Sequence, residues 1–274
     1  MKTLITITAI CVSALPVLAA DTTKIVTSTN MAGWLFYDDV LDTPNNSLGS
    51  FVPGPGNPPL GFGSAQINVA GPARVNLATY QFAGVKLADI TTLKFTTYNP
   101  LAGNGEGPGS QRSGYLNFNV DFNGSDTWQR RLVYVPRQNG VVLQNTWQEW
   151  DAISGGTALW GYSGNNWPVT GEPGTTLKTW SQILTQYPGV RIRVTDSFLG
   201  IRVGEPYNSG YTENIDSFKF GTSNGTTIFN FEDVDRTPKS KDACKDGGWQ
   251  SVYRADYSVF KNQGDCIQYV NTGK

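Results

Sequence analysis

The clearest pattern in the chain is an alternation of apolar and polar side chains that begins after Gly114. Leu116, Phe118, Val120 and Phe122 alternate with asparagine and aspartate residues, which predicts a strand with one face on an apolar core. Turn-forming residues follow at 123–126 and again at 136–140, with further strand-like sequence after each. We therefore expect residues 114–151 to form an antiparallel meander at the centre of the fold.

The same kind of pattern predicts short strands in the rest of the chain. They are expected at residues 24–28, 65–69, 75–82, 93–98, 190–194, 200–203, 215–220 and 227–231. One helix is expected over residues 177–187, where apolar side chains recur every three to four positions, with Thr175 or Thr176 as its cap and Pro188-Gly189 as its end. About ten short strands, one helix and no alternation of strands with helices predict an all-β fold, an antiparallel two-sheet sandwich that is jelly-roll-like.

Composition divides the chain into three parts. Residues 1–19 combine Lys2, an apolar run and a small-residue cleavage site, as in a secretory signal peptide, and no later apolar run could span a membrane. Residues 20–235 are expected to form the sandwich, interrupted by long loops at Gly49–Gly63, which holds four prolines, and at Pro100–Ser113. Residues 236–274 are a Lys-, Ser- and Thr-containing linker followed by a small tail. We therefore expect an exported protein.

Charge and residue types exclude several classes of function. The net charge of -1 gives no basic surface for nucleic acid or anionic lipid. The absence of histidine excludes His-dependent triads and most catalytic zinc sites. After signal removal only Cys244 and Cys266 remain. An even pair in an oxidising compartment predicts a disulfide, with free thiols or metal ligands as the alternatives. No feature of the sequence fixes an oligomeric state.

The tail carries the one resemblance to a known group of proteins. Its segments CKDGGW at 244–249 and FKNQGDC at 260–266, followed by Tyr269-Val270, resemble a C-terminal element shared by secreted bacterial proteins of unassigned function. The body, with YLNFNVDF and NTWQEWDA, is similar to the β-sandwich part of some members. The resemblance implies a bacterial origin and a sandwich, and it brings no catalytic or binding residues.

An aromatic cluster is the first candidate site. Trp160, Tyr162 and Trp167 lie near Asn165 and Asn166, and indole rings stack on sugar rings while amides bind hydroxyl groups. Packing in the core is the alternative for the same aromatic residues. Trp147 and Trp150 lie in one strand and cannot face the same side, so at least one is expected in the core.

Carboxylates give two further candidates, each with a simpler alternative. Glu149 and Asp151 stand two residues apart, so a strand would place both on one face, where they could act as the acid and base of a glycan-active enzyme. Asp38, Asp39 and Asp42 form a second acidic group beside an aromatic run. A solvated face is the favoured interpretation of both groups.

A hairpin turn offers oxygen ligands for a cation. Asp121, Asn123 and Asp126 would suit a structural calcium ion, although their spacing is not that of an EF-hand. Asx turns explain the same residues, so we expect no cofactor, with calcium as the alternative.

Three functions remain open from the sequence. The leading hypothesis is a secreted sandwich that binds a polysaccharide or cell-surface glycan without catalysis, through Trp160, Tyr162, Trp167, Asn165 and Asn166. The alternatives are a glycan hydrolase or lyase that uses Glu149 and Asp151, and a structural cell-surface or matrix protein whose edge strands pair with neighbours.

Overall fold

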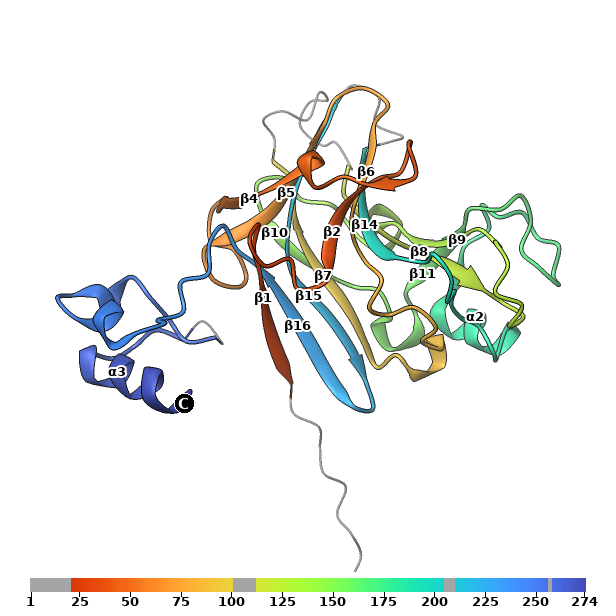
Figure 1. Cartoon of the computed structure of the whole chain (residues 1–274). Coiled ribbons are helices and arrows are strands. Elements are labelled where there is room, and N and C mark those ends of the chain that lie inside the picture. The colour runs from red at the N-terminus through yellow and green to blue at the C-terminus, as the bar shows by residue number, and fades with distance from the viewer. Residues whose placement is uncertain (1–20, 101–111, 205–209, 256–257) are drawn as a thin grey trace, which may run out of the picture.

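The protein is a β-sandwich with a small C-terminal tail beside it (Figure 1). The computed structural model describes residues 21–100, 112–204, 210–255 and 258–274. The predicted signal peptide and most of the second predicted long loop lie outside these residues. No helix in the described ranges has both the length and the apolar character needed to cross a membrane. The all-β, two-sheet prediction is confirmed.

The first sheet has seven strands built around β15. Strand β15 pairs antiparallel with β16, β5 and β7, and β10 extends this sheet beyond β7. At the edge, β1 runs parallel to β16, so the sheet is not purely antiparallel. Its strands are β1 Thr22–Val26, β4 Gly49–Pro53, β5 Gly63–Val69, β7 Thr92–Tyr98, β10 Trp147–Asp151, β15 Tyr211–Thr222 and β16 Gly225–Phe231.

The second sheet has nine strands, in the order β12-β11-β9-β8-β14-β6-β2-β3, with β13 beside β8. Its described pairings are antiparallel. The strands are β2 Trp34–Asp38, β3 Thr43–Pro44, β6 Arg74–Thr79, β8 Tyr115–Asp121, β9 Arg131–Tyr134, β11 Leu159–Tyr162, β12 Lys178–Thr179, β13 Arg191–Ile192 and β14 Leu199–Gly204.

The core lies between the two sheets. Leu116, Phe118 and Val120 of β8 are fully buried in it, as their alternation predicts. Trp34 of the second sheet meets phenylalanines of β15 and β16 edge-on, with ring centroids 5.0 to 5.3 Å apart. Aromatic and branched side chains from both sheets thus close one continuous apolar layer, and the alternate residues of each strand point away from it.

The central meander is only partly as predicted. Strands β8 and β9 form the expected hairpin, but β10 pairs with β7 in the other sheet. The predicted turn that follows β9 is the short helix α1, Pro136–Asn139. The neighbour of β9 on its other side is β11. The third strand of the prediction therefore lies on the other side of the core, in the first sheet, where its Trp150 is buried.

The predicted helix is present but shorter and differently capped. It is α2, Trp180–Gln186. Thr179, rather than Thr175 or Thr176, accepts a hydrogen bond from the backbone N–H of Gln182, while the side chain of Gln182 accepts one from the N–H of Thr179. This reciprocal capping box satisfies two backbone donors at the helix start, so the helix begins after Thr179.

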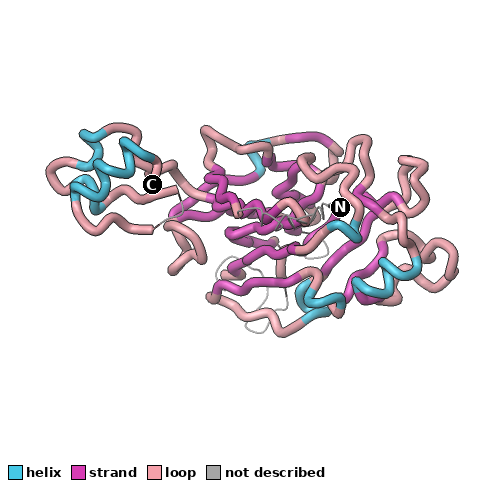
Figure 2. The backbone as a smooth tube through the Cα atoms, turned by 90° about the horizontal axis from the view of Figure 1, so that it is seen from below, coloured by secondary structure: helices cyan, strands magenta, loops and turns pink. Residues whose placement is uncertain are grey.

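The tail holds its own small apolar cluster. Figures 1 and 2 show it to one side of the strands in two perpendicular views. The predicted Cys244–Cys266 disulfide is present, and both cysteines are buried with Phe260. A helix that was not predicted, α3 Gln263–Thr272, completes the tail. Phe62 of the sandwich stacks on Tyr253 of the tail at 5.1 Å between ring centroids, which ties the two parts together.

Candidate functional site

The two tryptophans predicted to stack on sugar lie in the core. Trp160 and Trp167 are 0% and 1% exposed. Their indole Nε1 atoms donate to the carbonyls of Ala152 and Thr176, each at 2.8 Å. The platform predicted from Trp160 and Trp167 is therefore wrong, because neither ring presents a face to solvent and each indole N–H is already satisfied within the protein.

The other members of that cluster do not make a site by themselves. Tyr162 is half-buried against Phe122 and Trp167, and its hydroxyl donates to the carbonyl of Gln129 at 2.9 Å. Asn165 and Asn166 are exposed. The predicted site required an exposed indole beside these two amides. Because Trp160 and Trp167 are buried, neither provides one.

The Glu149 and Asp151 carboxylates share one face of β10, as predicted, but both are engaged by lysine. Lys94 lies 3.0 Å from a Glu149 oxygen and 3.4 Å from an Asp151 oxygen, and Lys219 lies 2.5 Å from Glu149. Partial burial alone would raise the pKa of both acids, but the lysine contacts and, at Asp151, backbone N–H donors lower it instead. Neither acid is prepared to hold a proton near neutral pH, which the acid of a carboxylate pair must do.

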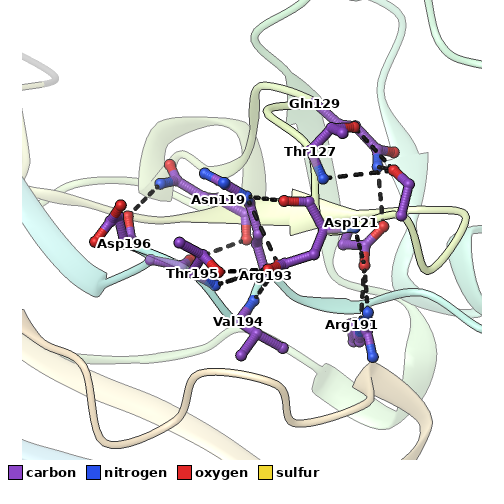
Figure 3. Close-up of polar contacts among 12 residues, drawn as sticks. Asn119, Asp121, Thr127, Gln129, Arg191, Arg193, Val194, Thr195 and Asp196 are labelled. Carbon is purple, nitrogen blue, oxygen red and sulfur yellow. Dashed lines mark hydrogen bonds and ion pairs between the residues drawn. The ribbon is translucent and has the colours of Figure 1, made fainter.

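Asp121, one of the three predicted cation ligands, serves as a hydrogen-bond acceptor, as Figure 3 shows. The buried Asp121 carboxylate accepts from Arg191 at 2.8 Å, from Gln129 at 2.9 Å and from backbone N–H groups of its own turn. Asp126 turns away and accepts from the backbone N–H groups of Val194 and Thr195. Within the ranges the structure describes, no three acidic, cysteine or histidine side chains group as a metal would require.

The hydrogen bonds of Asp121 and Asp126 hold the loop between β8 and β9 in place. Asp126 fastens the loop to residues 194–195, and the Val120 N–H donates to the Arg130 carbonyl at 3.1 Å. The loop carries Trp128 and Arg130 on the outer side of the second sheet. The backbone that carries these two residues is thereby anchored to the sheet rather than left on a free hairpin.

The outer face of the second sheet forms a groove of about 770 Å³, which continues into a smaller one of about 260 Å³. Residues that alternate with the core residues of each strand point into it. They are Tyr37 of β2, Arg74 of β6, Asn119 of β8, Arg131 of β9 and Arg202 of β14. A volume of this size is typical of a small-molecule or oligosaccharide site.

A carboxylate between two guanidinium groups organises the floor of the groove. The Asp39 side chain is 5% exposed and lies 2.7 Å from Arg131 and 3.1 Å from Arg202. Arg131 is also fixed by Asn119, whose Oδ1 accepts from its Nε at 3.0 Å. The acidic group that was expected to be solvated therefore includes one buried member, and the solvated-face interpretation is wrong for Asp39.

Aromatic rings border this polar floor. Trp128 is 50% exposed and lies over the Arg131 guanidinium, and Tyr80 is 39% exposed. Phe198 and Tyr37 are packed together beneath them, 4.8 Å between ring centroids. Burial and the hydrogen bond to Asp42 raise the pKa of Tyr37 well above its usual value, so its hydroxyl remains a donor at any physiological pH.

Three residues of the groove have an uncommon backbone conformation. Asp42, Arg130 and Asp196 have positive φ angles of 54°, 71° and 47°, and all three line the groove. Non-glycine residues with positive φ are uncommon and persist where the surrounding structure enforces them, often at binding sites. Here the hydrogen bonds of the β8–β9 loop provide that enforcement for Arg130.

The sequence alone did not identify this groove. Its residues come from six strands and from the loops between them, which are distant in the chain, and no local motif unites them. The alternation in β8 and β9 does mark Asn119 and Arg131 as facing away from the core, which is the one signal that points to this surface. Trp128 gives no such signal, because it stands in a loop.

Comparison with known proteins adds little to this geometry. No protein-family model and no curated protein matches the chain. Among solved structures, the chain is similar to TmCBM61 in complex with beta-1,4-galactotriose, with 10% sequence identity and a TM-score of 0.28 over 69% of this chain and 88% of that one.

Proposed function

We propose that the chain binds glycans in the groove on the outer face of its second sheet, without turning them over. The observation that carries the proposal is Trp128, a half-exposed indole that lies beside the Arg131 guanidinium in a groove lined by further guanidinium, amide and carboxylate groups. Sugar rings offer apolar C–H faces to such an indole and hydroxyl groups to such a floor. Trp128 and Tyr80 take the role that the sequence assigned to Trp160 and Trp167.

The polar floor is suited to hydroxyl ligands because its groups are already oriented. Arg131 is held by Asp39 and Asn119, and Arg202 by Asp39. A ligand that meets these groups has no flexible side chains to order, so less entropy is lost on binding. The same arrangement favours binding over catalysis, because the Asp39 carboxylate is occupied by ion pairs with Arg131 and Arg202.

We further propose that the protein acts outside the cytoplasm. Residues 1–19 have the sequence of a secretory signal peptide, and the Cys244–Cys266 disulfide is of the kind that persists in oxidising compartments. A polysaccharide or a cell-surface glycan is then the partner that this environment supplies.

The direct test is a binding screen of the mature protein. Soluble oligosaccharides on an array and insoluble polysaccharides in pull-down assays would be offered to the native protein and to Trp128→Ala. We expect binding to a subset of glycans, lost in Trp128→Ala but retained in Trp249→Ala, which removes a tryptophan of the tail. Absence of binding across both formats, or binding that Trp128→Ala leaves intact, would exclude this groove as the site.

A further inference from the structure

The groove has a composition that the overall charge of the chain conceals. Six of the ten arginines of the chain line it and its continuation, namely Arg74, Arg130, Arg131, Arg137, Arg193 and Arg202, whereas no lysine does. Only three acidic residues face them, Asp39, Asp42 and Asp196. A chain with a net charge of -1 thus has one surface with a surplus of positive charge.

Arg130 and Arg137 differ in their surroundings from the arginines that contact a carboxylate. Arg131 and Arg202 share Asp39, and Arg193 lies 3.7 Å from Asp126. Arg130 and Arg137 are exposed, and no carboxylate of the described residues forms an ion pair with either. Their guanidinium groups are available to a ligand.

Guanidinium groups have a specific preference among ligands. Their planar N–H donors match the two oxygens of a carboxylate, or those of a sulfate, in parallel hydrogen bonds. A hydroxyl group offers no such pair of oxygens and no charge. An all-arginine groove therefore distinguishes acidic sugars from neutral ones more strongly than lysines on a flexible surface would.

Building on the proposed glycan site, we infer that its ligands are acidic glycans, whose carboxylate or sulfate groups are bound by Arg130 and Arg137 while a sugar ring stacks on Trp128. Arg131 and Arg202 share the single carboxylate of Asp39, so the floor keeps a surplus of positive charge while neither guanidinium group is buried without a partner. The exposed arginines supply the contacts to the ligand. Nucleic acid is a less favourable ligand, because Asp42 and Asp196 are also exposed on the groove and would repel a continuous phosphate backbone.

The test compares matched pairs of glycans. Oligogalacturonate is set against the same oligosaccharide after reduction of its carboxyl groups, and a sulfated galactan oligosaccharide against its desulfated form, with a single-stranded oligonucleotide as a further arm. We expect the charged member of at least one pair to bind roughly tenfold tighter at low salt. Added salt should weaken its binding, since exposed charges are screened.

Variants connect that preference to the two arginines. Arg130→Gln and Arg137→Gln should each reduce the ratio of charged to neutral affinity by roughly two- to fivefold, the range of exposed ion pairs. Lys245→Gln, which makes the same change in charge on the tail, should leave the ratio unchanged.

The outcomes separate the two proposals. Equal binding of charged and neutral members would overturn the inference about acidic ligands and leave the glycan site standing. An oligonucleotide bound as tightly as the acidic glycan would also overturn it, since the groove would then recognise charge alone. Failure of every glycan to bind would remove the proposed function and this inference with it.

Discussion

Asp39→Asn tests whether the groove floor is built as described. The substitution keeps the shape of the side chain but removes the charge that lies between Arg131 and Arg202, at 2.7 and 3.1 Å. Both arginine side chains are 14% exposed, so solvent compensates little for the lost partner. Breaking a buried ion pair from one side costs at least about 3 kcal/mol of the free energy of unfolding.

Glu149→Gln is the matched control for this prediction. Glu149 also bridges two cations, Lys94 and Lys219, but it is 39% exposed. A pair with that exposure is worth about 1 kcal/mol or less. The two variants therefore differ in burial while the chemistry of the change is the same.

The assay is urea unfolding of the native protein and both variants, with thermal unfolding beside it. In a sandwich of this size we expect a drop in Tm of roughly 6 to 12 °C for Asp39→Asn, and no more than about 4 °C for Glu149→Gln. Equal costs, or a smaller cost for Asp39→Asn, would refute the view that burial makes the Asp39 cluster the stabilising one.

Three other predictions concern parts of the molecule away from the floor of the groove. Burial raises the pKa of Glu232 from 4.5 to about 7, so the folded protein keeps a proton that the unfolded chain releases. Stability should therefore fall by roughly 2 kcal/mol as the pH rises from about 4.5 to 7, and unfolding at several pH values should show a smaller fall in Glu232→Gln; an unchanged pH profile would contradict the assignment. Replacing both Cys244 and Cys266 with serine should destabilise the tail by about 3 kcal/mol, seen as rapid proteolysis of the tail with an intact sandwich; a protease-resistant tail would count against its having a separate core. Because the oxygens of Asp121 accept hydrogen bonds from Arg191 and Gln129, EDTA should leave Tm unchanged, whereas a drop in Tm that calcium reverses would show that a cation binds.

The class of fold could be predicted from the sequence because it depends on local patterns. The alternation at 116–122 gives β8 and its buried face, and the glycine- and asparagine-rich turn gives the β8–β9 hairpin. Which sheet a strand joins is not local. Trp147–Asp151 has the same alternation whether it pairs with β9 or with β7, and only packing across the core selects β7.

The tail contains helix-boundary signals without a strong apolar periodicity between them. Asn262 caps α3 by accepting from the N–H of Asp265, and Gly273 ends the helix with a φ of 71°. Asparagine before a helix and glycine after it are ordinary boundary signals. The mean hydrophobic character of the segment is low, so the apolar periodicity that revealed α2 is weak here.

The site was harder to predict because residue type does not determine exposure. Trp160, Trp167 and Trp128 are all near polar residues in the sequence, yet the first two are buried and the third is half-exposed. Each buried indole finds a carbonyl acceptor in the folded chain, which a sequence cannot reveal. Asp39 likewise becomes buried only when Arg131 and Arg202 approach from two other strands.

The measurement that tests the central claim most directly is calorimetric titration of the best-binding oligosaccharide into the native protein, Trp128→Ala and Trp249→Ala. We expect one site per chain, with affinity reduced roughly five- to tenfold in Trp128→Ala, since stacking on an indole is worth about 1 kcal/mol. Trp249→Ala should bind as the native protein does. An affinity that is the same in all three proteins would contradict a glycan site in the groove.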